Sequence, residues 1–204
     1  LISFQKERVV LLKTLTTVAS VALPIEERWS IKRCRYAPDG SSVGRVCIAA
    51  GTHGDEMMGQ LIIYLVQQRI GKHPDALRGT VDFYPMLNPL GLDIGERLVP
   101  SGTRLDMNRA FPGSPNGTPL EYMCHQVIQD MRGADLVLDL HASARNKSEL
   151  YEVRVSAKEA ERLLPRVRAL CPQLIWVYPD KGSFSASLTG ALGAVGTDAV
   201  ILEA

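Results

Sequence analysis

The chain has 204 residues, of which 46% are hydrophobic and 22% are charged, and its formal net charge is +1. This length and composition are typical of one globular domain with a sizeable core. Proteins that mainly bind nucleic acid or an anionic membrane usually carry a basic excess or a basic stripe, and this sequence has neither. We therefore expect no nucleic-acid partner and no membrane partner.

The N-terminal region, residues 1–42, has the least regular pattern, and we interpret it as an irregular or strand-forming part of the same domain. The stretch SFQKERVVLLKTL at 3–15 has the spacing of a short amphipathic helix. WSIKRCRYA at 29–37 alternates like an exposed strand and ends at the turn sequence Pro-Asp-Gly. The apolar stretch 9–23 is interrupted by Lys13 and by hydroxyl residues, so it is too short and too polar to span a bilayer.

From Val43 onward, apolar runs alternate with helical patterns. Strands that alternate with helices favour an α/β fold, here a mixed, mostly parallel sheet with helices on both faces. In such sheets, the loops that follow the carboxyl ends of the strands meet at one edge and bind ligands there. The runs at 46–50, 80–86, 135–140, 174–178 and 199–203 predict strands, and the patterns near 57–70, 119–132, 157–170 and 185–193 predict helices.

Candidate metal ligands follow two of these predicted strands. His53 and Glu56 lie in GTHGDE after the first run, and His141 lies in DLHAS after the third. A catalytic zinc ion takes three such ligands and keeps one position open for water. If the first motif stood alone, we would interpret its acids as partners of a helix dipole and His53 as an ordinary loop residue. The second histidine favours one Zn²⁺ ion instead. Asp139 lies on the same strand face as His141 and is either a partner of that histidine or an ordinary strand acid that faces solvent or a helix.

The segment 87–119 between the second and third predicted strands is rich in Gly, Pro and Asn, which prevents any long helix there. Ordered loops of this length are more often functional than decorative. The segment carries Arg97, Arg104 and Arg109. Because arginine binds carboxylates through two parallel hydrogen bonds and also stabilises oxyanions, we expect this loop to form the substrate side of the site.

Five motifs, GTHGDE, NPLG, DMNRAFPG, DLHAS and VILEA, occur in this order. Together they resemble the zinc carboxypeptidase superfamily, and most closely its succinylglutamate desuccinylase and aspartoacylase branch, over residues 45–204. The resemblance implies that His53, Glu56 and His141 are the zinc ligands. It also implies that Glu203 is the general base that activates water.

The same resemblance assigns the substrate side. Asn108 and Arg109 match the pair that binds the substrate carboxylate. The arginine that polarises the scissile carbonyl matches Arg97 by its place before VPSG, whereas Arg104 lies closer to Asn108, and both stay candidates. Tyr178 is the residue we can offer for the family's substrate-contacting tyrosine. The β-rich portion that follows the base in this branch is absent, so we expect residues 1–204 to be a single zinc-hydrolase catalytic domain, truncated at its C-terminus.

We therefore expect a zinc-dependent hydrolase that cleaves an amide bond next to a free carboxylate, as an N-acyl amino acid deacylase does. The alternatives are a metallocarboxypeptidase that acts on peptides and, from another class, a noncatalytic metal-binding domain. The expected partner is a small-molecule or short-peptide substrate with a free carboxylate, and the sequence says nothing of the oligomeric state. The cysteines, which form no C-x-x-C pair, indicate free thiols and a cytoplasmic location; they are Cys34, Cys47, Cys124 and Cys171.

Overall fold

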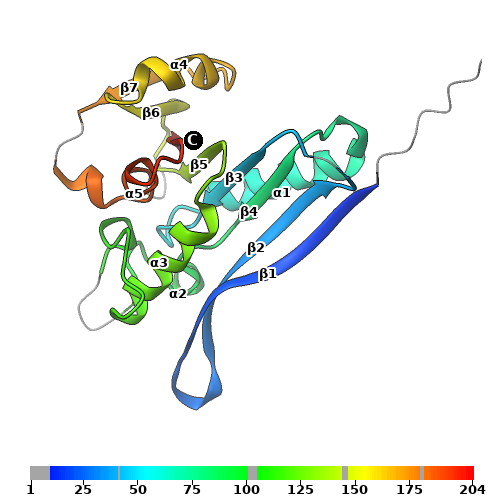
Figure 1. Ribbon diagram of the computed structural model, residues 1–204. Helices are drawn as coiled ribbons and strands as arrows, with labels where there is room; N and C mark the ends of the chain where they lie inside the picture. The colour runs from blue at the N-terminus through cyan, green and yellow to red at the C-terminus, as the bar shows by residue number, and fades with distance from the viewer. Residues whose placement is uncertain (1–9, 41, 101–104, 144–146, 180–181) are drawn as a thin grey trace, which may run out of the picture.

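The computed structural model describes residues 10–40, 42–100, 105–143, 147–179 and 182–204 (Figure 1). In these ranges, eight strands form a single mixed sheet with the spatial order β1-β2-β4-β3-β5-β8-β6-β7. The strands are β1 (Leu11–Ala22), β2 (Arg28–Pro38), β3 (Arg45–Ala50), β4 (Thr80–Tyr84), β5 (Leu136–His141), β6 (Glu152–Ser156), β7 (Leu174–Tyr178) and β8 (Ala199–Glu203).

The centre of the sheet is parallel. β4, β3, β5 and β8 run in the same direction as neighbours, and β7 runs parallel to β6 at one edge. β1 and β2 form an antiparallel hairpin, β2 pairs antiparallel to β4, and β6 pairs antiparallel to β8. The predicted fold class, a mixed and mostly parallel sheet, is confirmed. β6 was not predicted, and its antiparallel direction places its first residue beside the carboxyl ends of the parallel strands.

The N-terminal region corrects one prediction. The helix predicted at 3–15 is wrong from Leu11 onward, because β1 is a long strand paired along its length with β2. Threonine and valine are frequent in β1, and their branched Cβ atoms favour strands over helices. Residues 3–9 of that prediction lie outside the described residues. β2 is a strand as predicted, although Trp29 and Ile31 are buried and the strand is not an exposed one.

The helices form where capping and apolar spacing agree. At α3, the Thr118 side chain accepts a hydrogen bond from the Glu121 N–H and the Glu121 side chain accepts from the Thr118 N–H, with a proline in the first turn. At α5, the Ser187 side chain accepts from the Gly190 N–H. The α-helices are α1 (Met58–Lys72), α2 (Pro89–Ile94), α3 (Pro119–Met131), α4 (Ala160–Arg168) and α5 (Leu188–Ala194), and the 3-10 helices are η1 (Pro24–Glu26), η2 (Pro74–Ala76), η3 (Met107–Arg109) and η4 (Gly182–Ala186).

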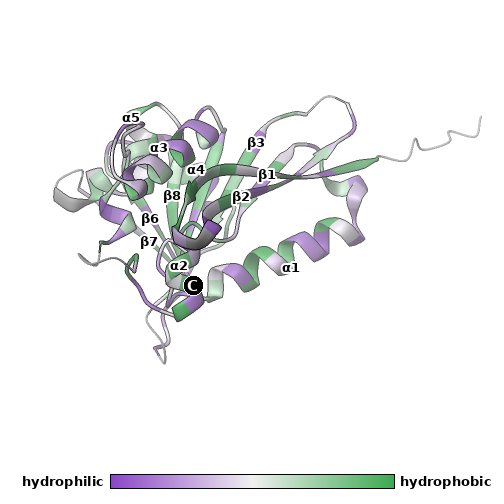
Figure 2. Ribbon diagram, turned by 90° about the horizontal axis from the view of Figure 1, so that it is seen from below, coloured by the Kyte–Doolittle hydropathy of each residue, from purple (hydrophilic) through white to green (hydrophobic). Residues whose placement is uncertain are grey.

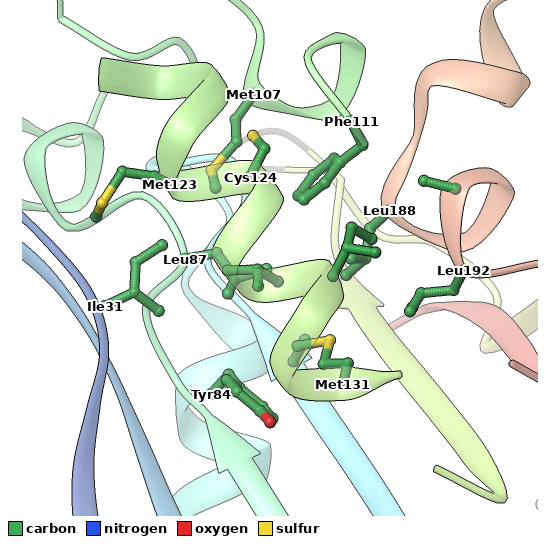
Figure 3. Packing of buried hydrophobic residues seen from close by; sticks show 14 of the residues in the cluster. Ile31, Tyr84, Leu87, Met107, Phe111, Met123, Cys124, Met131, Leu188 and Leu192 are labelled. Atoms are coloured by element: carbon green, nitrogen blue, oxygen red, sulfur yellow. The ribbon is translucent and has the colours of Figure 1, made fainter. Parts of the chain in front are cut away.

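Helices cover both faces of the sheet, as predicted. On one face, residues of α3 and α5, such as Met131 and Leu188, form a core cluster with Tyr84 of β4 and Val137 of β5. Figure 3 shows part of this cluster around α3. On the other face, residues of α1 and α4 pack with residues of β4, β5 and β6. These include Ile63, Phe83, Leu140, Val155 and Leu163.

Figure 2 shows hydrophilic and hydrophobic residues alternating along α1, which has one face on the sheet and one face toward solvent. Within the described ranges, the structure contains no helix with the length and apolar character that a bilayer span requires. The four cysteines are free, as predicted; Cys171 is exposed and the other three are buried.

Candidate metal centre and active-site cleft

The three predicted metal ligands lie together. His53 and Glu56 are in the loop between β3 and α1, and His141 is the last residue of β5. Nδ1 of His53 is 2.8 Å from Oε1 of Glu56, and Nδ1 of His141 is 2.9 Å from Oε2. The two Nδ1 atoms are 3.2 Å apart, and all three side chains are buried. Ligand atoms of the three residues lie within 4.8 Å of one another, which indicates a metal-binding cluster.

Two aspartates orient the imidazole rings. Nε2 of His53 is 3.2 Å from Oδ1 of Asp106, and Nε2 of His141 is 3.1 Å from Oδ2 of Asp139. A carboxylate at Nε2 favours a proton on that nitrogen, so Nδ1 of each ring is the nitrogen that faces Glu56 and that a metal ion would bind. The contact with Asp139 is the one predicted from the strand face. Asp106 was not predicted as a partner of His53, although it is the first residue of the DMNRAFPG motif.

The cluster concentrates negative charge beside the two rings. Burial alone would raise the pKa of Glu56, but hydrogen bonds with His141 and His53 outweigh it and hold the pKa well below its ordinary value. Burial would lower the pKa of His53, yet its hydrogen bonds with Asp106 and Glu56 raise it. Burial is likewise outweighed at His141, where the charge of Asp139 and the hydrogen bonds with Asp139 and Glu56 raise the pKa. This environment favours a bound cation.

The spacing of the donor atoms also fits a metal ion. Ligand atoms around a tetrahedral ion with zinc-like bonds are about 3.3 Å apart. The two Nδ1 atoms are 3.2 Å apart, close to this spacing, and the ligand atoms of the three residues all lie within 4.8 Å of one another. Because both Nε2 atoms are held by aspartates, the rings present one nitrogen each to the same point.

A cleft of about 260 Å³ opens over this cluster. Its walls bring together seven of the predicted site residues; besides the three ligands, they are Arg97, Asn108, Arg109 and Glu203. Arg104 lies outside the described residues. Tyr178 does not line the cleft; its ring stacks on Phe184 with centroids 4.4 Å apart.

Hydrogen bonds fix three polar side chains of the segment 87–119. Oδ1 of Asn108, in η3, accepts a hydrogen bond from the Leu188 N–H at 3.0 Å, which ties the loop to the start of α5. Nη1 of Arg109 donates to the carbonyl oxygen of Asn108 at 2.6 Å. Nη1 of Arg97 lies 2.7 Å from Oε1 of Glu56, so this arginine reaches the metal-binding cluster directly. The loop therefore delivers two arginines and an amide to the same cleft.

Glu203 lies at the end of β8, paired in register with His141 of β5. Its side chain is largely buried, and burial raises its pKa. Nη1 of Arg154, in β6, is 2.9 Å from Oε1 of Glu203. Arg154 was not predicted as a site residue because β6 was not predicted; its five residues carry only a short alternation of Val153 and Val155 with polar residues.

A family model for the succinylglutamate desuccinylase/aspartoacylase catalytic domain matches residues 42–204 of the chain. The chain belongs to this family. The resemblance that the sequence motifs indicated is thereby confirmed at the level of the family and its fold.

The chain is similar to a deacetylase, to a succinylglutamate desuccinylase/aspartoacylase and to a metallo-carboxypeptidase. An N-alpha-acetyl-L-2,4-diaminobutyric acid deacetylase from Halomonas elongata is 32% identical over 101 residues, which are 48% of this chain and 28% of that protein. A succinylglutamate desuccinylase/aspartoacylase from Rhodobacter sphaeroides has a TM-score of 0.76 at 21% identity, over 98% of this chain and 60% of that one.

A metallo-carboxypeptidase from Pseudomonas aeruginosa, solved in complex with (2-guanidinoethylmercapto)succinic acid, has a TM-score of 0.64 at 19% identity. This match covers 93% of the present chain and 55% of the carboxypeptidase. The two solved structures share the fold with this protein. The chain spans 60% or less of the length of each of these three relatives.

The family motif GTHGDE includes a glycine that the packing requires. A Cβ atom on Gly54 would overlap the backbone of Gly91 and the carbonyl oxygen of Glu96. Gly54→Ala should therefore displace the loop that carries His53 and Glu56, and we expect the affinity for Zn²⁺ to fall at least about tenfold in a calorimetric titration. Gly71→Ala is the control, because a Cβ there meets nothing within 4 Å. Unchanged affinity in the Gly54 variant would mean that the loop does not hold the ligands.

Proposed function

We propose that this protein is a zinc-dependent amidohydrolase that removes the acyl group from an N-acyl amino acid with a free carboxylate. The observation that carries the proposal is a single cleft that contains the buried His-Glu-His cluster, a buried glutamate and the Asn-Arg pair. The similarity to the Halomonas elongata deacetylase supports deacylation over other amide hydrolysis.

Zinc is the proposed ion because two imidazoles and one carboxylate are a frequent donor set of catalytic zinc sites. His53, Glu56 and His141 would hold it, with Asp106 and Asp139 fixing the two rings. When bound, zinc supplies a Lewis acid that polarises a carbonyl group and makes a water molecule more acidic.

Glu203 is the proposed general base. Its carboxylate would take a proton from the attacking water and return it to the leaving nitrogen of the amide. The burial that raises its pKa suits a group that must hold a proton between these two transfers. Arg97 would stabilise the negative charge that develops on the carbonyl oxygen, and we prefer it to Arg104 because its guanidinium already contacts Glu56.

Asn108 and Arg109 are the proposed carboxylate-binding pair. Because the Leu188 N–H occupies Oδ1 of Asn108, the amide NH₂ group is left as the donor for a ligand. The neighbouring guanidinium adds charge-assisted hydrogen bonds, which hold a carboxylate more strongly than a neutral group.

This assignment predicts how the enzyme treats substrate charge. The wild-type kcat/KM for an N-acetyl amino acid should exceed that for its amide by on the order of 10- to 100-fold, the value of one or two charge-assisted hydrogen bonds. Arg109→Ala should bring the two substrates close to parity, and Arg109→Lys should recover only part of the difference. Equal wild-type kinetics on acid and amide would remove Arg109 from the substrate site.

The whole proposal is tested by elemental analysis joined to hydrolysis assays on a panel of N-acyl amino acids and short peptides. We expect about one zinc ion per chain, and amine release from the acyl amino acids that stops on chelation and returns with Zn²⁺. Faster cleavage of peptides would favour the metallocarboxypeptidase alternative. Bound metal without turnover on any substrate would favour a noncatalytic metal-binding domain.

We also propose a cytoplasmic location, which the free cysteines support because thiols persist in reducing compartments.

A further inference from the structure

Arg154 makes three contacts that fix its guanidinium beside the proposed base. Its Nη1 is 2.9 Å from Oε1 of Glu203, and its Nε is 2.6 Å from Oε1 of Glu152. The guanidinium carbon also lies over the ring of Trp176, 4.9 Å from the centroid. An arginine held on both carboxylates and on an aromatic face has little freedom left, so it presents a fixed hydrogen-bond donor.

The register of the strands explains why a cation is needed here. In the antiparallel pair of β6 and β8, Glu152 lies directly opposite Glu203. Like charges directly opposite each other across a strand pair repel. Arg154, two residues along β6 on the same face as Glu152, bridges both carboxylates and offsets this repulsion. Trp176 is its register partner on β7 and supports the guanidinium from the far side.

We propose that Arg154 is a positioning residue for Glu203, an inference that rests on the proposed function. By holding Oε1, Arg154 sets the orientation of the carboxylate and leaves Oε2 as the oxygen that exchanges protons with water and with the leaving nitrogen. It acts through Glu203 and does not itself bind the substrate, because its charge is already matched by two carboxylates.

Kinetics of Arg154→Gln test this role in the zinc-loaded protein. We expect kcat to fall on the order of 10- to 100-fold, the cost of a misplaced catalytic group, while KM and zinc content change by less than about twofold. Arg154→Lys should recover part of kcat, since it restores the charge but not the two-pronged geometry. The matched control is Arg166→Gln, which removes an arginine from Asp198, 3.0 Å away, outside the cleft, and should leave kcat unchanged. A raised KM with unchanged kcat would make Arg154 a substrate ligand and overturn the proposal.

A second comparison separates positioning from simple relief of repulsion. In Glu152→Gln/Arg154→Gln, the repulsion between the two opposed glutamates is gone, so recovery of kcat to the wild-type value would overturn the proposal. If kcat stays low, Arg154 is needed for the orientation of Glu203 itself.

A double-mutant cycle with Arg154→Gln and Glu203→Gln gives a readout without turnover. We expect the unfolding equilibrium constants in urea to show a coupling of about 1.5- to 5-fold, as for a partly exposed ion pair. Absence of coupling would overturn the pairing whatever the activity. A wild-type protein that hydrolyses nothing on the panel would refute the proposed function, whereas an active wild type with an equally active Arg154→Gln would refute this inference alone.

Discussion

Replacing Glu203 by Gln is expected to lower kcat by on the order of 10²- to 10⁴-fold, the contribution typical of a general base. Glutamine keeps the shape of the side chain but cannot accept the proton. Zinc affinity should stay within about threefold of the wild-type value, because Glu203 is not one of the three residues of the metal-binding cluster. Steady-state kinetics of the zinc-loaded variant and a calorimetric zinc titration measure the two effects.

The control for this prediction is Glu161→Gln, which removes a carboxylate from the exposed surface of α4 and should leave both quantities unchanged. If Glu203→Gln loses zinc together with activity, Glu203 belongs to the metal site and the base must be sought elsewhere. If kcat falls less than about threefold, Glu203 plays no part in proton transfer.

The metal-binding cluster could be predicted from the sequence because its residues follow strands whose direction the sequence also predicts. His53 and Glu56 lie in the loop after one apolar run, His141 follows another, and parallel strands bring such positions to one edge. α1 and α3 could also be predicted from the sequence, because the helical spacing of apolar residues is a pattern within each segment.

What the sequence did not predict depends on contacts between distant segments. The helix predicted at 3–15 extends into β1 because the apolar spacing of those residues also fits a helix, whereas their pairing with β2 depends on a segment further along the chain. Asp106 is one acid among many until the loop folds and places it 3.2 Å from His53. Arg154 gains its role from the register of β6 on β8, and no short motif encodes that register.

Asp82 is a further case, because an acid inside the apolar run 80–86 gave no hint of its partners. Its side chain is fully buried at the centre of β4. Nε and Nη2 of Arg35, from β2, donate to its two oxygens at 2.7 and 2.8 Å, and Nε of Arg45, from β3, donates at 2.7 Å. The carboxylate thus joins three adjacent strands. Burial alone would raise the pKa of Asp82, but the hydrogen bonds from Arg35 and Arg45 outweigh it and lower the pKa.

Asp82→Asn should therefore lower the free energy of unfolding by about 3 kcal/mol at pH 7, because it leaves two arginines in the sheet without their counter-charge. Since the pKa of Asp82 is lower in the folded state than in the unfolded state, the stabilisation is complete above the unfolded value of about 3.9 and is lost as the pH falls through the folded value. The difference in the free energy of unfolding between wild type and variant, measured in urea, should thus become smaller below about pH 4. Asp93→Asn, on the exposed end of α2, should change stability by about 0.5 kcal/mol or less at every pH. If the difference in the free energy of unfolding between wild type and Asp82→Asn does not depend on pH, Asp82 stabilises the sheet through packing and not through its charge.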